Sequence, residues 1–103
     1  MKSEPTFGGT IRALRNERGE PLRVVAAAVE IDSTLLSKIE RGDRLPTPAQ
    51  IKKFAKYFGL PLDGLTAKAI ADKIVGEYGH HSATLQAVKI VKERVSPYLK
   101  ESK

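Results

Sequence analysis

The stretch Pro21–Gly42, PLRVVAAAVEIDSTLLSKIERG, decides the fold of this chain, because it has the pattern of two short helices joined by a tight turn. In its first half, apolar residues recur at positions i, i+3, i+4 and i+7, which is one face of an amphipathic helix. These residues are Leu22, Val25, Ala26 and Val29. Pro21 suits the first helical position, because its missing N–H would have no partner there. The pattern therefore predicts a helix that begins at Pro21.

The second helix of the stretch, residues 33–41, has sequence signals at both ends. Asp32 is a good N-cap, and Ile31 before it can pack on Leu36 as a hydrophobic staple. Gly42 supplies the left-handed residue that ends the helix. At ~100° per residue, apolar and polar residues fall on opposite arcs of this helix. The apolar arc holds Leu35, Leu36 and Ile39, and the polar arc holds Ser33, Thr34, Ser37, Lys38 and Arg41.

The polar arc of this helix suits DNA contact. An α-helix fits the major groove, and hydroxyls, lysine and arginine can bond to base edges and phosphates there. A solvated helix face is the alternative interpretation of such an arc. The short connection to the preceding helix, and the basic residues on either side, favour DNA binding.

Residues 21–47 closely resemble the helix-turn-helix of the Cro and phage-repressor class, the Xre-like regulators. The residues that carry the resemblance are Ala26, Ile31, the run LSKIERG at 36–42, and the run Arg44-Leu45-Pro46-Thr47. The likeness extends from about Phe7 to Leu65. It departs from the family pattern at Glu30, where the family usually has glycine, and at Val24 and Ala27, where the family is usually polar.

The resemblance implies an all-α, five-helix Cro/repressor-like bundle over residues 6–65. It does not explain residues 66–99, whose apolar pattern predicts a C-terminal helical extension that packs on the same domain and dimerises. The resemblance implies a sequence-specific, DNA-binding transcriptional regulator, with repression as the expected action, that reads the major groove with helix 33–41. We expect it to bind as a homodimer, because one recognition helix reads only a few base pairs. The expected partners are a second copy of the chain and double-stranded DNA with a palindromic operator. The alternative is an antitoxin-like or other protein-interaction module, in which the extension binds a second protein and DNA binding is secondary.

The expected site residues fall into three groups. Ser33, Thr34, Ser37 and Lys38 are expected to read bases, and Arg41, Arg44, Thr47 and Lys52 to contact phosphates. For Lys52, keeping the surface soluble is an equal alternative. In the resembled family an arginine at the position of Arg15 pairs with the glutamate at the position of Glu40. We expect that ion pair here, with a surface charge at Arg15 as the alternative.

Composition restricts the remaining possibilities. The chain has 103 residues, a net charge of +6 and a pI near 9.7, which fit one basic domain with a polyanionic partner. It has no cysteine, so no disulfide, thiolate zinc site or cysteine nucleophile is expected. No apolar run reaches membrane-spanning length and no signal peptide is visible, so we expect a cytoplasmic protein without membrane contact.

No motif predicts an enzyme or a cofactor. The chain has no paired-carboxylate signature, glycine-rich phosphate loop or nucleophile elbow. His80 and His81 are a possible metal or pH-sensing pair, but adjacent side chains diverge and no well-placed carboxylate completes a tetrahedral set. We interpret them as part of a linker between helices.

The rest of the first 65 residues predicts three more helices. One covers about Thr6 to Arg18, and one begins with a capping box made by Thr47 and Gln50. The apolar face of the latter consists of Ile51, Phe54, Ala55 and Phe58. A short fifth helix is expected at Leu62–Leu65.

The extension predicts two apolar-faced helices, one ending at Gly79 and one that begins near Ser82 and that Pro97 ends or kinks near Val95. An exposed apolar patch of that extent usually marks an interface. The expected dimer contacts are Ile70, Ile74, Tyr78, Val88, Val91 and Val95. The alternative is a monomer in which the last helix folds back on the one before it.

Overall fold

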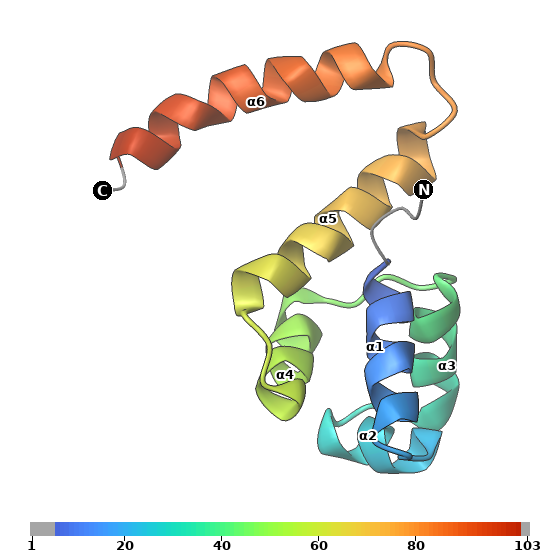
Figure 1. Cartoon of the computed structure of the whole chain (residues 1–103). Helices are drawn as coiled ribbons and strands as arrows, with labels where there is room; N and C mark the ends of the chain where they lie inside the picture. Colours follow the sequence, from blue (N-terminus) through green and yellow to red (C-terminus); the bar gives the residue numbers. More distant parts are fainter. Residues whose placement is uncertain (1–5, 102–103) are drawn as a thin grey trace. The chain divides into compact units, whose positions relative to one another are not determined.

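The computed structural model describes residues 6–101, and within this range the chain forms six helices joined by turns and loops, with no β-strand (Figure 1). The helices are α1 (Phe7–Glu17), α2 (Leu22–Ala28), α3 (Ser33–Arg41), α4 (Pro48–Phe58), α5 (Leu62–Tyr78) and α6 (Thr84–Glu101). The predicted all-α fold is confirmed. The chain divides into two compact units, and the division falls within α5, after Lys73.

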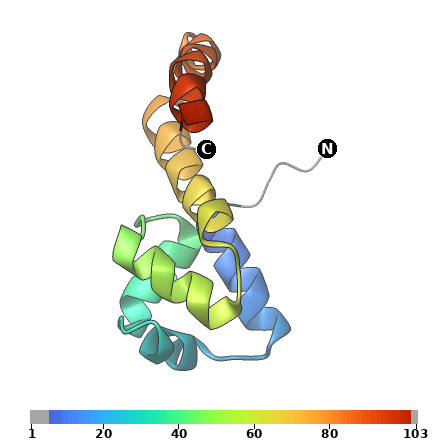
Figure 2. The same ribbon diagram turned by 90° about the vertical axis from the view of Figure 1, so that its left-hand side faces the viewer.

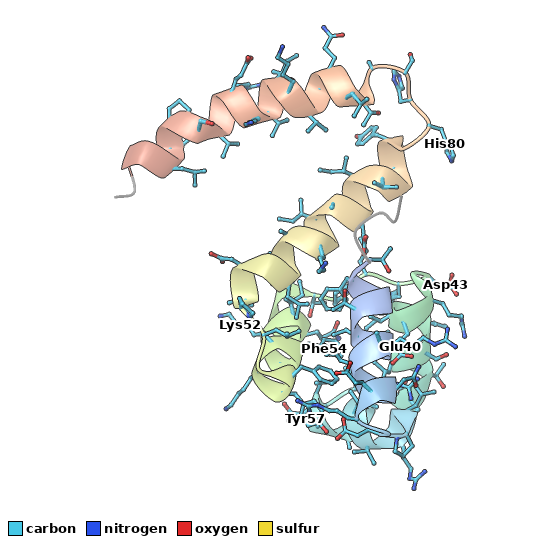
Figure 3. The ribbon with its side chains drawn as sticks, in the orientation of Figure 1. Glu40, Asp43, Lys52, Phe54, Tyr57 and His80 are labelled. Atoms are coloured by element: carbon cyan, nitrogen blue, oxygen red, sulfur yellow. The ribbon has the colours of Figure 1, made fainter. Side chains whose placement is uncertain are left out.

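The first unit has one apolar core that draws on α1 to α4 and the first half of α5. Figures 1 and 2 show α1 beside α3, and α2 and α3 joined by a short turn. The ring of Phe54 on α4 meets the ring of Phe7 on α1 edge to face at 5.5 Å, and Figure 3 shows Phe54 directed toward α1. The most deeply buried side chains are Phe7, Phe54, Ile11, Leu36, Ile39, Val25 and Val29.

Local capping signals set the ends of α3 and α4. The Asp32 carboxylate accepts a hydrogen bond from the Leu35 N–H at 2.7 Å, and Gly42 ends α3 with φ of 82°. Thr47 and Gln50 form the predicted capping box at the start of α4. Pro21 is the N-cap of α2, one residue before the first helical position expected for it. Pro21 is not helical itself, since its ψ is an extended 160°, but its carbonyl accepts hydrogen bonds from the N–H groups of Val24 and Val25.

Glu30 makes the turn between α2 and α3 in the left-handed conformation, with φ of 62°. Only glycine adopts this conformation without a steric cost, so the turn is strained. The Lys53 ammonium on α4 lies 2.6 Å from a Glu30 carboxylate oxygen, and its hydrogen bond lowers the pKa of Glu30. The ion pair thus connects the turn to α4. Val24 and Ala27 on the outer side of α2 are exposed.

Helix α5 is one continuous element, and the short fifth helix expected at Leu62–Leu65 is its first part. From Thr66 to Tyr78 the sequence has no proline and holds three alanines and two lysines, which are good helix formers, so the single Gly76 does not end the helix. Leu65 and Ala69 face the core of the first unit, and one turn later the Asp72 carboxylate accepts from the Phe7 N–H at 2.9 Å. Helix α5 therefore caps the start of α1.

The second unit consists of the end of α5, a linker and α6. Pro97 was expected to end or kink this helix near Val95. Helix α6 continues through Pro97 to Glu101, so the expected end is wrong and the alternative, a kink, stays a prediction. Pro97 has no backbone N–H, so α6 lacks one helical hydrogen bond at this position. The Ser96 hydroxyl also donates to the Lys92 carbonyl at 2.7 Å.

The linker of the second unit holds both histidines. The His81 ring accepts from the Ala83 N–H through Nδ1 at 3.1 Å, just before α6 begins. Among residues 6–101 no three acidic or histidine side chains gather as metal ligands. Over the same range, no helix has the length and apolar character needed to cross a membrane.

Candidate nucleic-acid interface

Helix α3 has one face in the core and one face directed outward. Leu36 and Ile39 are 0% and 1% exposed, and Leu35 is half-buried. The predicted base-reading residues lie on the other side, where Thr34 and Lys38 are exposed and Ser33 and Ser37 are half-buried. The outer face of α3 therefore presents two half-buried serine hydroxyls, an exposed threonine and an exposed lysine.

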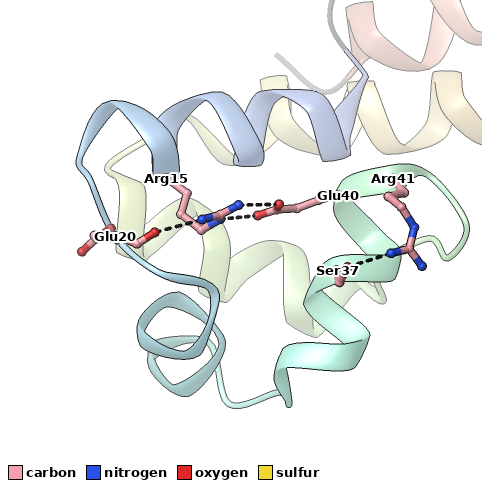
Figure 4. Close-up of polar contacts among 5 residues, drawn as sticks. All are labelled: Arg15, Glu20, Ser37, Glu40 and Arg41. Atoms are coloured by element: carbon pink, nitrogen blue, oxygen red, sulfur yellow. Dashed lines mark hydrogen bonds and ion pairs between the residues drawn. The ribbon is translucent and has the colours of Figure 1, made fainter.

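An ion pair connects α3 to α1. The Arg15 guanidinium donates through Nε to Glu40 Oε2 at 2.7 Å and through Nη2 to Glu40 Oε1 at 3.0 Å (Figure 4). Nη1 donates to the Glu20 carbonyl at 3.0 Å. The hydrogen bond that Arg15 donates to Glu40 raises the pKa of Arg15, and burial opposes this effect less strongly. The Arg15 and Glu40 side chains are 13% and 5% exposed. Because a bidentate pair has a defined geometry, this one restrains the orientation of α3 against α1.

Gly8 permits the close approach of α1 to the last turn of α3. A Cβ atom at this position would lie 2.1 Å from the Ile39 carbonyl oxygen and 2.7 Å from that of Glu40. No side chain fits there, because both obstacles are backbone atoms. Gly8 was not among the expected site residues, and this role was not predicted from the sequence. The available signal was a glycine between two inward-facing residues, Phe7 and Ile11.

Arg41, at the end of α3, is anchored at two points. Its Nε donates to Asp43 Oδ2 at 3.0 Å, and its Nη1 donates to Ser37 Oγ at 2.9 Å, the second contact being visible in Figure 4. Arg41 was expected to contact phosphate and Ser37 to read a base, and the structure brings the two together. Asp43 was not among the expected site residues, although it follows the Arg41-Gly42 pair directly.

The loop after α3 and the start of α4 add further exposed donors. Arg44 and Lys52 are exposed, and Figure 3 shows Lys52 on the outer side of α4. The Thr47 hydroxyl accepts from the Gln50 N–H at 3.1 Å, which leaves its own hydrogen for a ligand. Helix α3, this loop and the first turns of α4 thus carry donors suited to phosphate oxygens and base edges.

Comparisons with known proteins agree with this geometry. A family model described as helix-turn-helix domain matches residues 6–69. The HTH-type transcriptional repressor RghR of Bacillus subtilis is 40% identical over 65 residues, which is 62% of this chain and 48% of that protein. The uncharacterized HTH-type transcriptional regulator Rv0023 of Mycobacterium tuberculosis is 39% identical over 59 residues, 57% of this chain and 23% of that protein. The match to RghR thus spans about half of that relative's length.

A solved structure shares the fold. The clp gene regulator ClgR from Corynebacterium glutamicum superposes with a TM-score of 0.54 at 23% identity, covering 89% of this chain and 87% of that one. The family model covers more than half of the chain and includes both helices of the motif, α2 and α3. The predicted resemblance is confirmed: this chain belongs to the helix-turn-helix family.

Proposed function

We propose that this chain is a sequence-specific DNA-binding transcriptional regulator that places α3 in the major groove. The observation that carries the proposal is the two-sided environment of α3. Its apolar side is in the core, Glu40 ties it to Arg15, and its polar side is open with Lys38 exposed. A helix held so firmly with a polar face outward can read a groove. The names of the matched relatives support the same class of function.

The residues of the face divide between two kinds of contact. Ser33, Thr34, Ser37 and Lys38 face the bases, and Arg41, Arg44, Thr47 and Lys52 take phosphates. Phosphate contacts supply most of the affinity and set the register, while base contacts supply the choice of sequence. Lys38 is the strongest single candidate for base reading, because a lysine can donate to both O6 and N7 of guanine.

We further propose that the chain binds as a homodimer on a palindromic operator. One recognition helix reads only a few base pairs, and a two-fold dimer doubles that reading on half-sites about one helical turn apart. The proposed contacts are all exposed in the single chain, which supports this role for them. They are Ile70, Ile74, Tyr78, Val88, Val91 and Val95.

A protein-interaction module is the second candidate function. The observation that favours it is the position of α6, which lies beyond residue 69, where the match to the family model ends. Helix α6 nonetheless exposes Leu85, Val88, Val91 and other apolar side chains. If a second protein covers α6, it should co-purify with the chain at a fixed ratio, whereas a homodimer needs no second protein.

The test is selection of binding sites from random duplex DNA, followed by binding measurements on three variants. Lys38→Ala should weaken binding to the selected site by about 1–3 kcal/mol and relax the base preference at one position. Arg44→Ala should weaken binding to all sequences alike and reduce the salt dependence of binding. Lys56→Ala, an exposed lysine of α4 outside the proposed face, is the control. Parental affinity and base preference in Lys38→Ala would overturn the assignment of this face.

A further inference from the structure

We propose that Asp43 determines specificity by holding Arg41 in place and by opposing contact with DNA of the wrong sequence. This inference rests on the proposed function, since it assigns a role within the same DNA-binding face. Asp43 is an acid in the loop directly after α3, among residues otherwise suited to meet phosphates. Its presence there calls for an explanation, because a carboxylate repels the DNA backbone.

Two hydrogen bonds restrict the side chain of Arg41. A free arginine side chain on a surface samples many rotamers and can reach any phosphate nearby. Here Asp43 takes the Nε–H at 3.0 Å and Ser37 takes one Nη1–H at 2.9 Å, one from each side of Arg41 along the chain. A guanidinium has five N–H donors, so three stay available for DNA. These three N–H groups point in fixed directions, because the guanidinium group is planar and is held by two hydrogen bonds.

The negative charge of Asp43 has two effects on DNA binding. Its carboxylate offsets the charge of Arg41, so approach of this arginine to an arbitrary phosphate releases less energy than approach of an unpaired one would. The same carboxylate lies on the loop that meets the backbone and is repelled by it. Both effects weaken binding to any DNA. On the matching site, Arg41 contacts DNA while it keeps its hydrogen bonds to Asp43 and Ser37. The loss of DNA-binding free energy caused by Asp43 is therefore smaller on that site.

The solvent exposure of the Arg41–Asp43 pair argues against a purely structural role for it. Arg41 and Asp43 side chains are 54% and 60% exposed. Ion pairs this exposed contribute little to stability, because water screens them and ordering two side chains costs entropy. The pair is also separate from the fold-bearing pair of Arg15 and Glu40, which lies between α1 and α3. In this proposal the exposed pair therefore acts on the contacts between Arg41 and DNA, and not on folding stability.

The experiment compares Asp43→Ala, which removes both the charge and the acceptor for Arg41 Nε, with the parental chain on the selected site and on a scrambled duplex, over a series of salt concentrations. Binding to the scrambled duplex should tighten about 3–10-fold and its salt slope should steepen by about one phosphate contact. Binding to the selected site should change less, so the ratio of the two affinities should fall about 3-fold or more. Asp63→Ala, in the first turn of α5, removes the same charge elsewhere and should leave the ratio unchanged.

A double-mutant cycle separates anchoring from plain charge. In an Arg41→Ala background, Asp43→Ala should tighten binding to both duplexes alike and leave the ratio as it is. An unchanged ratio in the parental background, or an equal fall in the Arg41→Ala background, would overturn the role of Asp43. Failure of the proposed function looks different: the parental chain would itself bind the selected and scrambled duplexes equally. Circular dichroism of each variant checks that the helices are intact.

Discussion

At the scale of single residues, Gly8 sets how closely α1 can approach α3. Gly8→Ala places a methyl group against the Ile39 and Glu40 carbonyl oxygens, and backbone atoms cannot move aside as a flexible side chain can. We expect a loss of about 3 kcal/mol or more in the free energy of unfolding, measured by urea denaturation. Gly64→Ala is the matched control, because nothing lies within 4 Å of its added Cβ, and it should gain up to about 1 kcal/mol. Parental stability of Gly8→Ala would show that the two backbones are farther apart.

Glu40 is the second residue whose effect extends beyond its own position. Glu40→Ala leaves Arg15 charged and nearly buried without its carboxylate partner, and breaking such a pair costs about 3 kcal/mol or more. The variant should melt at a clearly lower temperature. Glu17→Ala, which removes an exposed glutamate from the end of α1, should melt close to the parental temperature. Equal melting temperatures for the two variants would mean that the pair does not restrain α3.

At the scale of elements, α5 belongs to the first unit through its initial turns, and Asp72 secures it there. The Phe7 N–H is in the first turn of α1, where no backbone carbonyl is available to it. Asp72→Ala should cost about 1–2 kcal/mol and speed hydrogen exchange at the Phe7 amide, measured by NMR. Asp72→Asn keeps an acceptor oxygen and should recover part of the protection. An unchanged exchange rate in Asp72→Ala would contradict the cap.

At the scale of the whole molecule, the proposed dimer determines how much DNA is read. Sedimentation of the parental chain at micromolar concentration should give a dimer mass. Val91→Asp places a charge among exposed apolar side chains of α6 and should give a monomer with intact helices. Gln86→Asp changes an exposed polar residue of the same helix and should stay dimeric. A monomeric mass for the parental chain, unaltered by Val91→Asp, would remove this segment from the proposed interface.

The amino-acid sequence alone determined the elements whose causes lie within a few residues. Asp32 and Thr47 cap helices that begin one residue later, and Gly42 ends α3, because capping bonds join a residue to amides or carbonyls at most one turn away. The division of α3 into core and outer arcs was likewise predictable, since helical periodicity alone produces it. The pairing of Arg15 with Glu40 was expected from the family resemblance, not from spacing.

Only the tertiary structure decided the features that join distant parts of the chain. Phe7 and Asp72 are 65 positions apart, and the obstacles above Gly8 belong to another helix, so no local pattern reports either. Glu30 takes a left-handed φ because both flanking helices are anchored in the core, and burial of those helices outweighs the strain of one residue. Arg41 and Asp43 are close in sequence, yet their bond depends on which way two flexible side chains turn. Local forces thus set the helices, and long-range packing set which backbones and charges meet.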